Sequence, residues 1–142
     1  MKKFSFWLWA TVIFQFLTGA IHAIGLFISP EPQNGTEKQL VDLMDTYHIP
    51  TGMGFNPTFG NLFWALSSCF TLLHFFAGWV NLYLYKKRIP INTMKGIMGI
   101  NVVISGISFG IMAALTFLPP IICTGFVFVS CVGAYLTANS KA

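Results

Sequence analysis

The sequence predicts an all-α, polytopic membrane protein, a bundle of four transmembrane helices with a short amphipathic helix in its outer loop. Of the 142 residues, 55% are hydrophobic and only 8% are charged, whereas about a quarter of the residues of an ordinary soluble domain are charged. Four apolar runs are each long enough for a helix to cross a bilayer, which takes about 20 residues. All four acidic residues fall in one polar segment between the first two runs. This composition excludes a soluble globular protein, because the chain has too little polar surface to cover a core in water.

The first apolar run, residues 4–28, follows the basic start Lys2-Lys3. A secretory signal peptide begins in the same way, and the small residues Ala20 and Ala23 would suit its cleavage site. However, the apolar core of a signal peptide has only about 7–15 residues. The run in this chain is longer than that, so we expect a transmembrane helix that is retained.

The polar segment, residues 29–59, is expected to lie outside the membrane. Asn34-Gly35-Thr36 matches a glycosylation acceptor pattern, but it is interpreted as a turn followed by a helix cap. Thr36 and Gln39 have the spacing of a capping box. The apolar residues that follow share one helical face: Leu40, Leu43, Met44 and Tyr47. We therefore expect a short amphipathic helix on the membrane surface, followed by a loop, residues 49–57, folded onto the mouth of the bundle.

The other three spans are predicted at residues 60–85, 93–117 and 120–138, within a single membrane domain, residues 1–142. The second span stops at the basic cluster 86–88. Pro119 and Pro120 mark the start of the fourth span, because proline is favoured in the first turn of a helix.

The basic residues indicate the orientation. With both termini in the cytoplasm, Lys38 is the only lysine or arginine outside, as the positive-inside rule requires. The aromatic residues Trp7, Trp9, Tyr83 and Tyr85 then fall near the inner membrane interface. Since the net charge of +4 is explained by topology and no basic helix is interleaved with aromatic residues, no nucleic-acid partner is expected.

Polar residues within the spans are the functional candidates, because an unsatisfied polar group is costly in lipid. No aspartate, glutamate, lysine or arginine lies in the core of any span, which disfavours a proton-coupled pump. A polar stripe on the first span comprises Thr11, Gln15, Thr18, Gly19, His22 and Gly25. One on the second comprises Ser67, Thr71, His74, Gly78 and Asn81. We expect these stripes to face each other, with Asn101, Ser105 and Ser108 of the third span completing the wall. The candidate ligand-binding residues are Gln15, Thr18, His22, Ser67, Thr71, His74 and Asn101.

Two interpretations of this seam remain open. The polar side chains could hydrogen-bond across helices and serve only packing, or they could bind a lipid-like molecule, a quinone head group or a haem. A haem shared by His22 and His74 is not favoured, because their depths differ by roughly 11 Å at 1.5 Å per residue. His48 could join His22 at a metal site, but no carboxylate accompanies them. The three cysteines lie in apolar runs without a CxxC pair. No catalytic or metal-binding residue is assigned, and an enzyme is not favoured.

Gly106 and Gly110 form a GxxxG motif on the third span. This motif allows close helix packing within the chain or a homodimer, and both remain open.

The Thr18-Gly19-x-x-His22 element and the Phe59-Gly60-Asn61 end of the outer loop complete a layout that resembles small uncharacterised bacterial four-helix inner-membrane proteins. In size and helix number the chain is also similar to the DoxX-like family. The resemblance implies a four-helix protein of the bacterial inner membrane and transfers no active site. We therefore expect a non-enzymatic binding or accessory component that contacts a hydrophobic ligand or a membrane protein partner through the outer loop and the seam. The alternative is a redox or quinone-handling protein that uses His22 or His74.

Overall fold

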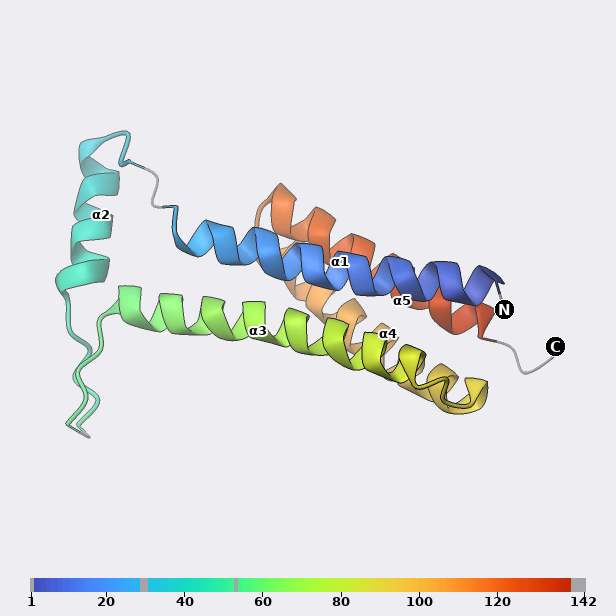
Figure 1. Cartoon of the computed structure of the whole chain (residues 1–142). Coiled ribbons are helices and arrows are strands. Elements are labelled where there is room, and N and C mark those ends of the chain that lie inside the picture. The colour runs from blue at the N-terminus through green and yellow to red at the C-terminus, as the bar shows by residue number, and fades with distance from the viewer. Residues whose placement is uncertain (1, 29–30, 53, 139–142) are drawn as a thin grey trace. The chain divides into compact units, whose positions relative to one another are not determined.

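The computed structural model describes residues 2–28, 31–52 and 54–138, and its regular elements are helices (Figure 1). Within these residues it has no strand, only an isolated antiparallel bridge between His48 and Thr58. The helices, in chain order, are α1 (Lys2–Leu26), α2 (Gly35–Thr46), α3 (Phe59–Lys86), α4 (Ile91–Leu115) and α5 (Leu118–Thr137). The predicted all-α class is confirmed.

Four of these helices, α1, α3, α4 and α5, are long and apolar enough to cross a membrane. Their limits differ by only one or two residues from the spans expected from the apolar runs. Many large apolar side chains on them point outward, including Phe76 at 67% exposure and Leu115 at 79%. Apolar surface on this scale is unusual on a monomer in water. It indicates an integral membrane protein.

Helix α2 begins at Gly35, one residue before Thr36, the residue that was expected to cap it. The Asn34 side chain accepts a hydrogen bond from the Glu37 backbone N–H at 2.9 Å. In return, the Glu37 carboxylate accepts from the Gln33 backbone N–H at 2.7 Å and from the Asn34 amide at 2.9 Å. This reciprocal arrangement satisfies donors at the helix start. The prediction of a box between Thr36 and Gln39 was therefore wrong, since Asn34 is the N-cap residue.

The chain forms two compact units. The first unit combines Met1–Gly19 with Leu73–Ala142, and so contains most of α1, the second half of α3, and α4 and α5. The second unit is Ala20–Leu72, which contains the end of α1, all of α2 and the first half of α3.

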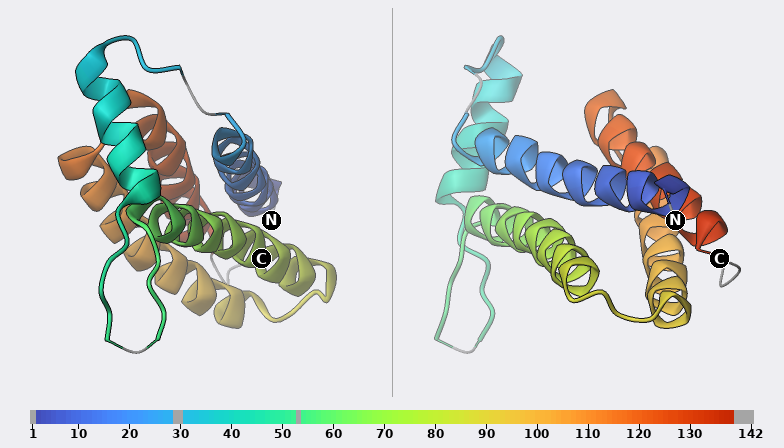
Figure 2. Two further views of the ribbon diagram at one scale, coloured as in Figure 1. Left: turned by 90° about the vertical axis from the view of Figure 1, so that its left-hand side faces the viewer. Right: turned by 45° about the vertical axis from the view of Figure 1, so that its right-hand side comes forward.

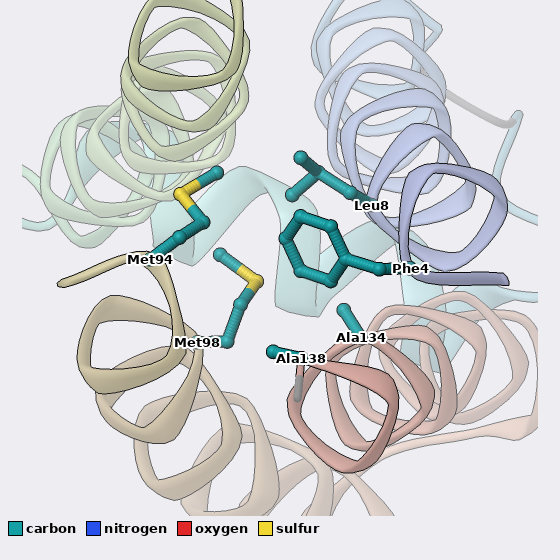
Figure 3. Close-up of a cluster of buried hydrophobic side chains, with 6 residues drawn as sticks. All are labelled: Phe4, Leu8, Met94, Met98, Ala134 and Ala138. Carbon is teal, nitrogen blue, oxygen red and sulfur yellow. The ribbon is translucent and has the colours of Figure 1, made fainter. Parts of the chain in front are cut away.

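The apolar core of the first unit joins three helices. It comprises Phe4 and Leu8 of α1, Met94 and Met98 of α4, and Ala134 and Ala138 at the end of α5. Figure 3 shows the two methionine side chains directed toward Phe4 and Leu8. Methionine fills irregular gaps between helices because its unbranched chain adapts to its neighbours.

Helices α4 and α5 pack against each other, as both views of Figure 2 show. Glycine makes room for an aromatic ring at their contact: a Cβ atom added to Gly106 would lie 3.1 Å from the Phe128 ring, and one added to Gly125 would lie 3.3 Å from Phe109. Small residues allow such close packing in membranes. The same pairing recurs in this unit at Gly19 with Phe75, Gly78 with Phe16, Gly99 with Tyr135, and Gly133 with Trp7. Gly106 is thus used within the chain, whereas the space beside Gly110 is open.

Candidate functional site

Three carboxamides of the first unit form a hydrogen-bonded group, here called the amide cluster: the buried Gln15 on α1, the buried Asn81 on α3 and the half-buried Asn101 on α4. The Asn81 Nδ2 donates to Gln15 Oε1 at 3.0 Å and to Asn101 Oδ1 at 3.2 Å. Gln15 Nε2 donates to the same Asn101 oxygen at 3.3 Å. Asn101 Nδ2 donates to Asn81 Oδ1 at 3.4 Å and to the Ile97 carbonyl at 2.9 Å. The stripes of the first two spans therefore do meet here, with Asn101 as the third wall.

The amide cluster is closed, in the sense that every amide in it both donates and accepts. Gln15 is only 3% exposed and Asn81 only 1%, so partners are required, because lipid offers none. A network whose members satisfy one another rigidifies the helices that carry it. For Gln15 and Asn101, this arrangement supports the packing interpretation over a ligand site.

The neighbouring hydroxyl groups of the first unit are also satisfied locally. Thr11 donates to the Trp7 carbonyl at 3.0 Å, Thr124 to Pro120 at 2.8 Å, and Ser105 to Asn101 at 2.6 Å. Each of these bonds returns to the carbonyl four residues earlier on the same helix, a common arrangement for Ser and Thr in helices. Two further candidates, Thr18 and His74, also belong to this unit: Thr18 is buried, and the His74 Cβ lies 3.4 Å from the position of a Cβ added to Gly19.

The remaining candidates, His22, Ser67 and Thr71, belong to the second unit. The His22 ring packs edge-on against Phe70, with ring centroids 4.8 Å apart and an interplanar angle of 67°. The ring also interacts electrostatically with the backbone of Ser67. Ser67 and Thr71 are one turn apart on α3 and are 8% and 7% exposed. The imidazole of His22 therefore lies beside the turn of α3 that carries Thr71.

His22 Nε2 and Thr71 Oγ1 are buried, and neither has a hydrogen-bond partner among the residues that the structure describes. These two atoms are here called the open pair. Leaving a polar atom unpaired in an apolar surrounding costs a few kcal/mol, on the order of 1–3, and nearly all buried polar atoms of proteins have a partner. The open pair is thus the place where this seam is chemically incomplete, in contrast to the amide cluster.

The segment that contains α2 is fixed to the start of α3 by several contacts within the second unit. The Tyr47 and Phe59 rings stack with centroids 6.4 Å apart. A Cβ added to Gly60 would lie 2.6 Å from Asp45 Oδ1, so glycine allows the end of α2 to approach α3. Asn61 accepts from the Thr58 backbone N–H at 3.1 Å while the Thr58 hydroxyl accepts from the Asn61 backbone N–H at 3.1 Å, which caps α3. The T-x-x-N spacing resembles a capping box and could have revealed this cap from the sequence.

The other histidine and the cysteines offer little for metal chemistry. His48 Nδ1 is 2.6 Å from the Asn56 carbonyl, so this ring closes the loop that follows α2. All three cysteines are free thiols. Within residues 2–28, 31–52 and 54–138, no three His, Cys, Asp or Glu side chains gather where they could hold a metal ion.

Comparisons with protein-family models, with curated proteins and with solved structures found no match.

Proposed function

We propose that this chain is a non-enzymatic binding or accessory protein of the bacterial inner membrane, and that it binds a lipid-like ligand at the open pair. The observation that supports this proposal is the contrast between two sets of polar residues. The amide cluster satisfies itself and holds α1, α3 and α4 together, whereas His22 Nε2 and Thr71 Oγ1 are buried without partners among the described residues. A ligand group that hydrogen-bonds to both atoms would remove that cost.

The proposed orientation has both termini in the cytoplasm and α2 at the outer surface. It is supported by the basic residues, of which Lys38 alone would lie outside. The apolar side chains Leu40 and Leu43 of α2 are 58% and 60% exposed, and Phe55 of the following loop is 78% exposed. With Tyr47 stacked on the start of a membrane-spanning helix, these side chains are suited to lie in the lipid interface or against a membrane protein partner.

The second candidate function is a redox or quinone-handling protein that uses His22. It is supported by the same unpartnered imidazole nitrogen, which could accept a hydrogen bond from a reduced quinone or ligate a haem. A Soret band in the purified protein, lost in His22→Phe, would favour this function.

The test of the proposed function is to identify what copurifies. Wild-type protein, extracted in a mild detergent, is expected to carry a lipid-like species that native mass spectrometry detects. The species should be lost or depleted in Thr71→Val, which removes the hydroxyl at nearly constant volume.

The matched control is Thr124→Val. Thr124 is equally buried, but its hydroxyl is satisfied by the Pro120 carbonyl on its own helix. Equal recovery of the species with Thr71→Val and Thr124→Val would contradict a site at the open pair, and a wild-type protein without any bound amphiphile would contradict the proposed function.

A further inference from the structure

We infer that the group bound by the open pair is an uncharged hydroxyl of an amphiphile, which donates to His22 Nε2 and accepts from Thr71. This inference rests on the proposed function, since it specifies the ligand of the same site. It follows from the hydrogen-bonding capacity of the two side chains and from the absence of charged residues in the parts of α1 and α3 that carry them.

The tautomer of His22 decides what the ligand must offer. The backbone of Ser67 interacts with the ring, and because Nε2 is the nitrogen without a hydrogen-bond partner among the described residues, we place this interaction at Nδ1. Within a helix the backbone N–H of Ser67 is already used in the helical ladder, so the Ser67 carbonyl is the acceptor and Nδ1 carries the proton. In a neutral imidazole Nε2 is then an acceptor only. It needs a donor from the ligand.

Thr71 supplies the complementary half of the site. A threonine hydroxyl both donates and accepts, and the Thr71 Oγ1 bonds to nothing else that the structure describes, not even to the carbonyl one turn earlier on α3. A ligand that has only carbonyl oxygens, such as an ester or an oxidised quinone, could accept from Thr71 but could not donate to His22. A single hydroxyl does both.

A charged head group is disfavoured on electrostatic grounds. No aspartate, glutamate, lysine or arginine occurs in residues 20–26 or 59–72, the parts of α1 and α3 that belong to the second unit. Burying a charge without a counterion is far more costly than burying a hydroxyl. The group is therefore uncharged.

Exposed apolar side chains on the same parts of α1 and α3 suit the apolar part of an amphiphile. Phe63 and Leu66 lie on the two turns of α3 before Thr71 and are 65% and 72% exposed, and Ile24 of α1 is 59% exposed. The Phe70 ring, which packs edge-on against His22, is itself only half-buried. The chain of the amphiphile would lie along these side chains while its hydroxyl reaches the pair.

The test uses two photoreactive probes that differ only in the hydroxyl. One is a diacylglycerol with a diazirine in an acyl chain, and the other is its 3-O-methyl ether. Both are crosslinked to wild-type protein reconstituted in phosphatidylcholine vesicles. The ether can accept a hydrogen bond from Thr71 but cannot donate one to His22. Loss of that one hydrogen bond should raise the half-saturating concentration of the ether about fivefold above that of the alcohol. His22→Phe keeps a ring against Phe70 and should abolish the difference between the probes, whereas Thr71→Ser should retain it.

The outcomes separate the inference from the proposed function. If neither probe labels the protein above the level of soluble bystander proteins, the proposed function fails. If both label wild type equally, and the quinol pair described next does so too, the hydroxyl inference fails while binding of a lipid-like ligand stands. Because the decisive comparison is made on wild type, it does not depend on whether a variant folds.

A second probe pair identifies the source of the hydroxyl. A photoreactive quinol and its dimethyl ether are compared in the same vesicles, under argon with dithionite to keep the quinol reduced. Preference for the quinol over its ether, stronger than the preference within the diacylglycerol pair, assigns the site to a reduced quinone. The reverse assigns it to a glycerolipid, and either preference supports the inference. Equal labelling within both pairs overturns it.

Discussion

Replacing Asn81 with leucine tests whether the amide cluster holds the helices of the first unit together. Asn81 takes part in three hydrogen bonds to Gln15 and Asn101, at 3.0, 3.2 and 3.4 Å. A hydrogen bond between membrane helices contributes about 0.6 kcal/mol on average, so losing all three should lower the free energy of unfolding by about 2 kcal/mol. This corresponds to a change of about 30-fold in the unfolding equilibrium.

The free energy of unfolding is measured by titrating bicelle-reconstituted protein with sodium dodecyl sulfate and following helix content by circular dichroism. The matched control is Ser68→Ala on the same helix, since the Ser68 hydroxyl donates only to the Trp64 carbonyl of α3 itself at 2.8 Å. The control should stay within about 0.5 kcal/mol of wild type, as most substitutions away from special features do.

A double-mutant cycle then separates the network from the size of the new side chain. Gln15→Leu and Asn81→Leu each leave an amide without its partner, so the double variant should lose less stability than the two single losses added together. Residues of one hydrogen-bond network typically show an interaction energy of about 0.5–3 kcal/mol. Strictly additive losses, or an Asn81→Leu variant that unfolds with wild-type stability, would refute the idea that the cluster ties α1, α3 and α4.

Three further predictions concern other parts of the chain. Gly106→Ala places a methyl group 3.1 Å from the Phe128 ring and should cost about 1–3 kcal/mol in the same titration, while Gly110→Ala has open space and should be neutral; a Gly110→Leu variant that alone changes the mass on native gels would instead indicate a homodimer. Asn34→Ala removes the N-cap of α2 and should cost that helix about 1 kcal/mol, seen as faster amide hydrogen exchange, whereas Thr36→Ala should not; faster exchange in Thr36→Ala alone would restore the Thr36 cap. In a chain whose native cysteines are replaced by alanine, Asp42→Cys should react with an impermeant maleimide in intact cells and Lys87→Cys only after lysis, because α2 is proposed to lie outside; the opposite pattern would invert the topology.

The sequence predicts the helices of this protein well because their signals are local. The length of an apolar run depends on the chain alone, and so the four spans follow from it within one or two residues. The spacing of polar residues likewise predicts the inward face of α3, on which Ser67, Thr71 and Asn81 are buried. Gly25 is the exception on α1: it continues the stripe of that helix but is exposed near its end.

Pairings between helices could not be predicted in this way. The spacing places Asn81 on the same face as the other seam residues, yet it does not reveal that Asn81 is the residue that bridges Gln15 and Asn101. Such a bridge depends on the axial position and rotation of three helices relative to one another, which no single helical periodicity determines. For the same reason, glycine counts alone did not show that Gly106 packs under Phe128. The cap of α2 was misplaced because Asn34 and Thr36 are both good N-cap residues, and only the backbone conformation distinguishes them.

The amide cluster and the open pair pose the same physical problem and differ in how it is solved. Lipid tails offer no hydrogen bonds, so buried polar atoms within a span need partners from protein, water or a ligand. Gln15 and Asn101 have Asn81, a side chain that donates to both of their oxygens. His22 Nε2 and Thr71 Oγ1 have no such third group among the described residues. One ligand hydroxyl would hydrogen-bond to both atoms, as Asn81 does to Gln15 and Asn101 in the amide cluster. A packing role alone would be served as well by valine at position 71, so under the proposed function the hydroxyl there serves a partner that the described residues do not provide. Thr71→Val should therefore affect ligand recovery more than it affects the stability of the protein.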